Sequence, residues 1–317
     1  MIKNEYQGNL GNHLLSYFAA RLIAEKYNLY LDTEPILGFP ETTRKVQGKI
    51  FEELQEIPER MLPYKKLCEI TEDAISQNKG LSLDHFYGYN YRDYYENNLD
   101  KAIKWLKIDK EIQDDLYNIQ DNDLLISVRN GDFITNGVAL PFEYYQSILD
   151  SNLIDYNKVY LISDDYDHPF MLRFKKYNPI YIREHYLCQF KMALKFKYVI
   201  ASHSTFCWFH ILLNKNLIKC FYPVLTDTRH SAWSERLIYK KFCDLRIDLP
   251  CMEYIYNVPP SRKLADVHFD YQEWFSNINH YRNSFIRSPY VKEKTDEVLN
   301  YHRKSTYRFL KVLPRSI

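Results

Sequence analysis

Residues 124–133 read Leu-Leu-Ile-Ser-Val-Arg-Asn-Gly-Asp-Phe, and they are the strongest indication of the fold class. Its first five residues form an almost wholly apolar run, which is typical of a strand buried on both faces of a sheet. The run ends at Arg129, and Gly131 then allows the chain to turn sharply. A buried strand followed at once by polar residues and a turn predicts the start of a strand–helix unit.

The alternation of strand and helix patterns continues from this stretch to residue 222. Further apolar runs of strand length lie at 159–162, 180–182, 198–201 and 218–222. The segments between the runs have helical spacing of apolar residues at 142–149, 170–177, 189–196 and 204–213. Pro141 is expected in the first turn of one helix, and Pro223 at the end of the last strand. Such alternation predicts an α/β fold with a doubly wound parallel sheet.

The N-terminal third carries one further unit of the same kind. Apolar residues recur at intervals of three or four within residues 8–31, which predicts a loop and a helix followed by a strand at 29–31. A second helix is expected over 95–118. Because polar residues 120–123 then mark a boundary, we expect two domains, 1–120 and 121–317, the second ending in a helical extension over 270–317.

Glycine is scarce and unevenly placed, which excludes one class of phosphate site. The chain has 8 glycines in 317 residues, and all of them lie within the first 137. An ordinary share of roughly 7% would give about 22. Neither G-x-x-x-x-G-K-[ST] nor G-x-G-x-x-G occurs. A phosphate bound by the C-terminal half is therefore expected to be held by side chains and helix starts.

The net charge and the cysteines indicate which binding partners and which cellular compartment to expect. A net charge of +1 gives no field that would attract nucleic acid. None of the six cysteines forms a C-x-x-C pair, so no zinc site is expected and a reducing compartment is the default. With no signal-peptide pattern and no run of 18 apolar residues, the sequence predicts a cytoplasmic protein. Basic residues near the C-terminus are expected on a solvated helix face, with attachment to the inner face of an anionic membrane as the alternative: Arg303, Lys304, Arg308, Lys311 and Arg315.

Ligands of open α/β sheets bind beyond the carboxyl ends of the strands, so the residues there form the candidate site. Arg129 can offer a guanidinium to a phosphate with Asp132 holding it in place, and a surface arginine with a turn aspartate is the alternative. Asp164 and Asp165 follow the next strand and can bind a ribose or a base. Asp165 and Asp167 also match the D-x-D pattern of metal-dependent sugar-nucleotide transferases, and an acidic helix cap is the alternative.

Two helix starts add candidate contacts. At Ser204 and Thr205, hydroxyl groups, unpaired backbone N–H groups and the helix dipole favour a phosphate, with simple capping as the alternative. Near the N-terminus, Gly11 allows close approach of a ligand, and Asn12 and His13 follow it; the alternative is an ordinary strand-to-helix turn. His203 and His210 lie seven residues apart with no third ligand nearby, so no metal site is expected there.

Four blocks in this order resemble the glycosyltransferase family of bacterial and animal α-1,2-fucosyltransferases. The family's G-G-L-G-N-Q segment is similar to residues 8–13, Gly-Asn-Leu-Gly-Asn-His, and its H-x-R-R-G-D-Y segment to residues 127–133. Its S-D-D segment corresponds to residues 163–165, and its N-S-T-F-S-W-W segment to residues 202–208, Ser-His-Ser-Thr-Phe-Cys-Trp. The order of the blocks is more specific than any single block.

The resemblance implies a GT-B architecture, in which two Rossmann-like domains face each other across a cleft. Domain 1–120 would supply the acceptor side, and domain 121–317 would hold the nucleotide sugar. The implied reaction is an inverting, metal-independent transfer of fucose from GDP-fucose to a glycan hydroxyl in surface polysaccharide synthesis. The implied partners are the nucleotide sugar and the glycan acceptor, and no cofactor is expected.

The resemblance also implies roles for individual residues. Arg129 would hold the β-phosphate and stabilise the leaving nucleotide. Asn12 and His13 would line the cleft from the opposite domain, and His13 is a hypothetical base. The expected donor-binding residues are Gly11, Ser127, Asn130, Asp132, Asp164, Asp165, Ser204, Thr205 and Phe206.

Two departures from the family pattern leave alternatives open. Ser127 and Asn130 stand where the family has His and Arg, so a different nucleotide sugar is an alternative donor. A metal-dependent transferase that uses Asp165 and Asp167 is a second candidate. A catalytically silent protein that binds a nucleotide sugar or a carbohydrate is a third.

Overall fold

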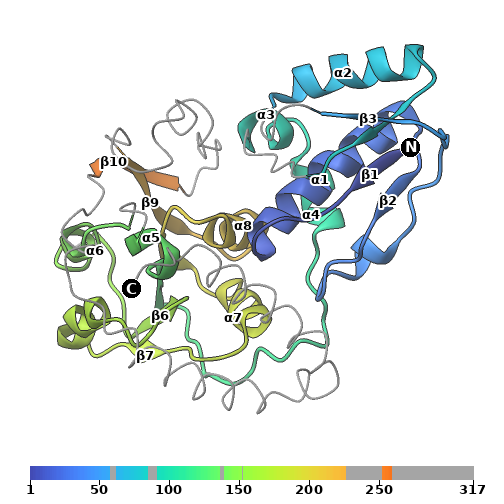
Figure 1. Cartoon of the computed structure of the whole chain (residues 1–317). Coiled ribbons are helices and arrows are strands. Elements are labelled where there is room, and N and C mark those ends of the chain that lie inside the picture. The colour runs from blue at the N-terminus through green and yellow to red at the C-terminus, as the bar shows by residue number, and fades with distance from the viewer. Residues whose placement is uncertain (58–61, 85–90, 136–138, 152, 226–251, 259–317) are drawn as a thin grey trace, which may run out of the picture.

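The strands of the chain form two parallel sheets in the computed structural model, which describes residues 1–57, 62–84, 91–135, 139–151, 153–225 and 252–258 (Figure 1). The predicted α/β class and the parallel strands are confirmed. Within these residues, no helix combines the length and the hydropathy needed to cross a membrane. The predicted extension over 270–317, with its basic residues, lies outside the described part of the chain.

The larger sheet has six parallel strands in the order β10-β9-β8-β5-β6-β7. They are β5 (Leu124–Val128), β6 (Val159–Ser163), β7 (Ile180–Tyr181), β8 (Tyr198–Ile200), β9 (Lys219–Leu225) and β10 (Met252–Val258). Numbered along the chain, this is the order 6-5-4-1-2-3, the same arrangement as in doubly wound dinucleotide-binding sheets. The chain changes its direction of progress across the sheet between β5 and β8. The topological switch point therefore lies between these two strands.

Both faces of the larger sheet are covered, which explains the continuous apolar strands. The covering helices are α6 (Phe142–Leu149), the 3₁₀ helix η2 (Pro169–Tyr177), α7 (Tyr186–Ala193) and α8 (Thr205–Leu213). Leu124 and Ile126 of β5 belong to the apolar cluster that includes α6 and η2, whereas Leu125 belongs to the cluster that includes α7 and α8. The side chains of β5 thus alternate between two buried faces.

The smaller sheet has the order β2-β1-β4-β3 and is built from strands of only three residues. Its elements and those around it are β1 (Ile2–Asn4), α1 (Leu10–Tyr27), β2 (Leu31–Thr33), η1 (Pro40–Thr43), β3 (Leu54–Glu56), α2 (Tyr64–Ser76), β4 (Gly80–Ser82), α3 (Tyr91–Tyr95) and α4 (Leu99–Trp105). The predicted helix within 8–31 is confirmed as α1, in which every residue from Leu14 to Ala24 is buried. It ends at Asn28, where a left-handed φ of 52° lets the backbone N–H bond the Ala24 carbonyl.

Helices α1 and α8 bring the two sheets together, and they lie side by side in Figure 1. One apolar core continues from Ile2 of β1 to Val199 of β8 and includes residues of both helices. Helix α1 starts beyond the carboxyl end of β1, and helix α8 starts beyond the carboxyl end of β8. Because the first turns of the two helices touch, the carboxyl ends of β1 and β8 face each other. The smaller sheet ends at Ser82 and the larger begins at Leu124, so the predicted domain boundary falls between them and stays a prediction.

Two local predictions are wrong for tertiary reasons. The helix expected over 95–118 is limited to α4, and the carbonyls of the following segment bind lysines instead: Lys191 Nζ bonds the Lys110 and Ile112 carbonyls, and Lys195 Nζ bonds that of Asp114. The strand expected at 218–222 also does not end at Pro223, because β9 continues to Leu225. Proline has no N–H to donate to a neighbouring strand, but β8 pairs with β9 only as far as Phe221 and so needs no donor from Pro223.

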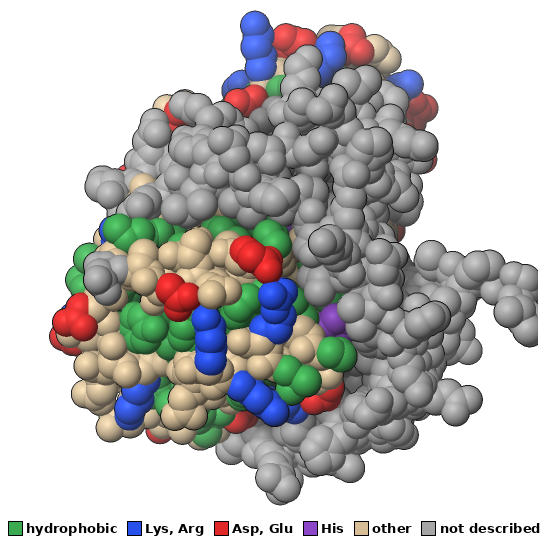
Figure 2. Space-filling model, turned by 90° about the vertical axis from the view of Figure 1, so that its left-hand side faces the viewer, with side chains coloured by type: hydrophobic (Ala, Val, Ile, Leu, Met, Phe, Trp, Pro, Cys, Tyr) green, Lys and Arg blue, Asp and Glu red, His purple; other side chains and the backbone are tan. Residues whose placement is uncertain are grey.

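Charges of both signs are interspersed with apolar and polar side chains on the described part of the face shown in Figure 2. This distribution agrees with the nearly balanced composition of 42 basic and 41 acidic residues.

Candidate functional site

The carboxyl ends of β5 and β8 meet at the switch point of the larger sheet, where ligands of doubly wound proteins bind. Ser127, in β5, and Ser202, just after β8, have their Oγ atoms 3.5 Å apart. Arg129 follows β5 directly, and the short helix α5 (Gly131–Thr135) begins two residues later. Two of the polar segments singled out in the sequence are thus side by side.

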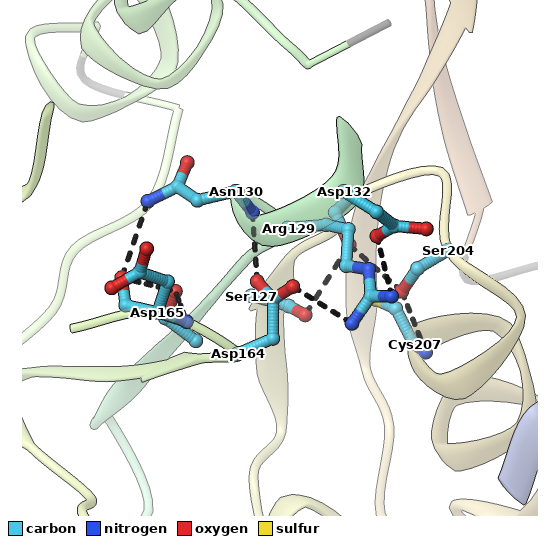
Figure 3. Close-up of polar contacts among 10 residues, drawn as sticks. Ser127, Arg129, Asn130, Asp132, Asp164, Asp165, Ser204 and Cys207 are labelled. Carbon is cyan, nitrogen blue, oxygen red and sulfur yellow. Dashed lines mark hydrogen bonds and ion pairs between the residues drawn. The ribbon is translucent and has the colours of Figure 1, made fainter. Parts of the chain in front are cut away.

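Arg129 lies between two carboxylates (Figure 3). Its Nη2 is 2.7 Å from Asp132 Oδ1, and its Nη1 is 2.8 Å from Asp164 Oδ2. The guanidinium carbon lies 5.2 Å from the centroid of the Phe133 ring. With its side chain only 21% exposed, Arg129 is held in a fixed orientation at the edge of the sheet. A positioned guanidinium of this kind suits a diphosphate, because its planar donors match phosphate oxygens.

Asp164 is fastened to the start of α5 as well as to Arg129. Its Oδ1 accepts a hydrogen bond from the Asn130 backbone N–H at 2.8 Å. Burial raises the pKa of the Asp164 carboxyl, and the Arg129 guanidinium opposes that rise. A Cβ on Gly131 would lie within 2.2 Å of Asp164 Oδ2. A side chain at position 131 would therefore displace this carboxylate oxygen from its place against the guanidinium.

Ser204 is the N-cap of α8, and its hydroxyl belongs to a buried chain of serines. Its Oγ accepts the Cys207 backbone N–H at 3.2 Å and lies 3.1 Å from Ser202 Oγ. Ser202 in turn contacts Ser127. The structure gives Ser204 the capping interaction that the sequence offered as the alternative, and a direct bond from its hydroxyl to a phosphate stays a prediction.

Gly11, Asn12 and Thr205 meet where the starts of α1 and α8 touch. A Cβ on Gly11 would lie 2.6 Å from the Thr205 backbone carbonyl carbon and 2.7 Å from the Phe206 nitrogen. Thr205 Oγ1 donates to Asn12 Oδ1 at 3.2 Å. Asn12 of α1 therefore contacts the first residue of α8, and a role for Asn12 in lining a cleft stays a prediction.

His13 and Phe206 turn away from this contact. His13 Nε2 lies 3.0 Å from the Gly8 carbonyl, and its ring stacks on Tyr6 at 4.9 Å. A carbonyl can only accept, so Nε2 carries the proton and Nδ1 is the nitrogen with a lone pair. Phe206 packs edge-on against Phe190 at 5.3 Å and is partly buried in the core. The packing of Phe206 is therefore that of a core residue.

Asn130 and Asp165 link the ends of β5 and β6. The Asn130 side chain is 1% exposed, and its Nδ2 lies 3.5 Å from the Asp165 carbonyl and 3.0 Å from the Met171 sulfur. Asp165 Oδ1 accepts the backbone N–H groups of Asp167 and His168, both at 3.2 Å. Burial, with the nearby Asp164, raises the pKa of Asp165 to about 6. Both side chains thus stabilise local structure beside the Arg129 ion pairs.

The two carboxylates of the D-x-D pattern do not converge on a common point. The acidic helix cap offered as the alternative is wrong as well: Asp165 Oδ1 binds backbone N–H groups of the turn before η2, and the N-cap of η2 is His168. Asp167 Oδ1 is 3.2 Å from Arg183 Nη1. Among the described residues, no group of three or more His, Cys, Asp or Glu side chains is placed to hold a metal ion.

Three residues near these edges were not singled out as site residues from the sequence. Phe133 stacks with Arg129, and His203 packs against Phe133 with ring centroids 4.8 Å apart. Asp84 lies just beyond β4, and its buried Oδ1 has no hydrogen-bond partner in the described part of the chain. Phe133 and His203 follow the apolar runs of β5 and β8, and these runs could have marked both residues as candidates for the site. The three-residue strand β4 gave no such signal for Asp84.

Comparisons with known proteins add distant structural neighbours. No protein-family model and no curated protein sequence matches the chain. A structure of NodZ α-1,6-fucosyltransferase soaked with GDP-fucose aligns with a TM-score of 0.42 and 13% identity, over 69% of this chain and 93% of that chain. A structure of fucosyltransferase NodZ from Bradyrhizobium aligns with a TM-score of 0.41 and 13% identity, over 69% and 94%. Functional assignments for individual residues rest on the geometry of this chain.

Proposed function

We propose that this chain is an inverting glycosyltransferase that binds a nucleotide sugar at the switch point between β5 and β8. The observation that carries the proposal is Arg129, fixed between Asp132 and Asp164 beside the start of α8. A guanidinium and a helix N-terminus together favour the diphosphate of such a donor. GT-B architecture is part of the proposal, with residues 1–120 supplying the acceptor side.

In the proposed reaction, the acceptor hydroxyl oxygen attacks the anomeric carbon from the side opposite the diphosphate. The bond from that carbon to the phosphate oxygen breaks, and the nucleoside diphosphate leaves with the electron pair. Arg129 stabilises the charge that develops on this leaving group, which is why a bound metal ion is not required in the proposal. The acceptor hydroxyl must also lose its proton to a base.

Two groups of the N-terminal unit are candidates for that base. His13 follows Asn12 in the first turn of α1, and an imidazole is the side chain that most often serves as a general base. Asp84 lies beyond the carboxyl end of β4, beside β1, with a buried carboxylate oxygen. Comparing His13→Gln with Asp84→Asn distinguishes them, because the variant that lacks the base should lose the rising limb of the pH–rate profile.

Fucose from GDP-fucose is the donor we propose, on the strength of the four sequence blocks that resemble α-1,2-fucosyltransferases. Ser127 and Asn130 depart from that pattern, so the donor is the first quantity to measure. Thermal-shift screening with GDP-, UDP- and TDP-sugars is expected to give its largest stabilisation with GDP-fucose. A larger effect from another sugar nucleotide would reassign the donor and leave the site unchanged.

Transfer to a glycan hydroxyl in the presence of EDTA tests the metal-independent mechanism. We expect the rate with EDTA to equal the rate with added Mg²⁺ or Mn²⁺. A rate restored only by the metal would favour the alternative transferase that uses Asp165 and Asp167. A donor that stabilises the fold but is never consumed, with any acceptor, would favour the silent binding protein. The biological setting we propose is surface polysaccharide assembly in the cytoplasm.

A further inference from the structure

His203 is a polar side chain at the switch point whose ring nitrogens have no hydrogen-bond partner in the part of the chain that the structure describes. It lies between Ser202 and Ser204, just after β8. Both of its ring nitrogens are shielded from solvent, and neither has a hydrogen-bond partner among the described residues. Its ring packs on Phe133 at 4.8 Å, and the Arg129 guanidinium carbon lies 5.2 Å from that same ring. His203 and Arg129 are therefore next to one aromatic side chain at the edge where a ligand is expected.

An imidazole in this position has unused hydrogen-bonding capacity. A neutral imidazole carries one N–H donor and one acceptor nitrogen, and buried groups of this kind are normally paired. Burial and the neighbouring Arg129 guanidinium lower the pKa of His203 to about 3, so the ring is neutral at physiological pH. The neutral ring can still donate one hydrogen bond without adding a second buried positive charge.

His210, in the adjoining helix α8, provides a contrast. Both of its ring nitrogens also lack partners in the described part of the chain, and burial lowers its pKa to about 3. However, it is 0% exposed and packs between Phe190 and Phe206 in the core. His210 therefore has the surroundings of a core residue, whereas His203 lies at the end of a strand beside Arg129 and the start of α8.

We propose that His203 binds the donor, its neutral imidazole donating a hydrogen bond to a phosphate oxygen of the nucleoside diphosphate. The ligand class follows from the neighbours: the Arg129 guanidinium and the start of the nine-residue helix α8 both favour an anion. The proposal rests on the proposed function, because it assigns a further residue to the same site. Of the charged groups beside this point, Arg129 attracts the phosphate, while Asp132 and Asp164 fix Arg129.

Calorimetry with GDP as the probe tests the assignment through three variants. His203→Phe keeps a ring on Phe133 but has no donor, and it should weaken GDP binding about 10-fold or more. His203→Asn retains an N–H donor and should stay within about 3-fold of the wild type. His210→Phe is the matched control and should bind GDP as the wild type does.

Nitrogen-15 NMR of the histidine-labelled full chain provides a readout independent of activity. The His203 signals, identified by their loss in His203→Asn, are expected to show a neutral ring at pH 7 and to shift when GDP is added. Unchanged GDP affinity in folded His203→Phe, or an imidazole signal that GDP leaves unmoved, overturns the assignment. If the wild type binds neither GDP nor any other nucleoside diphosphate, the proposed function fails and this inference fails with it. Wild-type binding with an unaffected His203→Phe refutes the inference alone.

Discussion

Replacing Arg129 by alanine removes the positive charge that the proposed mechanism places against the leaving diphosphate. The guanidinium makes ion pairs of 2.7 Å and 2.8 Å with Asp132 and Asp164. A phosphate oxygen bound at similar distance would put the two charge centres about 4 Å apart, which corresponds to about 4 kcal/mol at an effective dielectric constant near 20.

Two features of the site reduce that figure. The Arg129 side chain is 21% exposed, and the two carboxylates already partly neutralise it. We therefore expect Arg129→Ala to lose about 3 kcal/mol of transition-state stabilisation, or about 150-fold in kcat. Arg129→Lys keeps the charge but lacks the planar guanidinium that can pair with two oxygens in parallel, so its loss should be intermediate, about 10-fold.

The assay is release of the nucleoside diphosphate during transfer to the acceptor, measured at saturating donor. Arg173→Ala is a matched control, because Arg173 also pairs with a carboxylate, Glu143 at 3.0 Å, and stacks on a ring, Phe142 at 4.5 Å. That control should keep wild-type turnover. If folded Arg129→Ala retains turnover within about 5-fold of the control, Arg129 does not stabilise the leaving group and the electrostatic argument is refuted.

Three further variants test the surrounding structure by urea unfolding. Gly11→Ala should lose about 1–3 kcal/mol of unfolding free energy, because its Cβ would lie 2.6 Å from the Thr205 carbonyl carbon. The higher helix propensity of alanine should not offset this loss, and a variant as stable as the wild type or more stable would contradict the contact. Ser204→Ala should lose about 1 kcal/mol of unfolding free energy, because it removes the N-cap of α8. The control Ser76→Ala removes an exposed hydroxyl and should lose less than about 0.5 kcal/mol. Equal losses in the two variants would show that the cap does not stabilise the fold. The pKa of Asp165 is about 6 in the fold and about 3.9 unfolded, so its contribution to stability is present below pH 4 and is lost as pH rises through 6. Asp165→Asn should escape that loss and exceed the wild type at pH 7 by about 3 kcal/mol at most, and parallel pH curves for the two proteins would contradict the shift.

Local sequence was sufficient wherever burial repeats with a fixed period. The run from Leu124 to Val128 is apolar because β5 is buried on both faces, and its predicted limits match the strand. The apolar residues at intervals of three or four that predicted α1 are all buried in the helix. The placement of Arg129 and Asp164 was also accessible, because parallel strands carry their carboxyl ends to one edge of the sheet.

Distant contacts decided what local patterns could not. The strands β1, β3 and β4 have three residues each, too few for alternation to show, and the segment after α4 leaves the helix because Lys191 and Lys195 bind its carbonyls. A serine at a helix start can cap the helix or bind a phosphate, and only the 3.2 Å bond to Cys207 shows that Ser204 caps α8.

The alternation of strands and helices, and the polar residues that follow the strands, could be read from the amino-acid sequence. Three contacts became visible only in the folded chain: Gly11 touches Thr205, His203 and Arg129 pack on the same Phe133 ring, and Asp165 caps a turn. The difference is one of range, because the burial pattern of a strand or helix is recorded within a few neighbouring residues. The partner of a particular polar side chain comes from a distant segment, as with Asn12 and Thr205, and depends on how the sheets and helices pack.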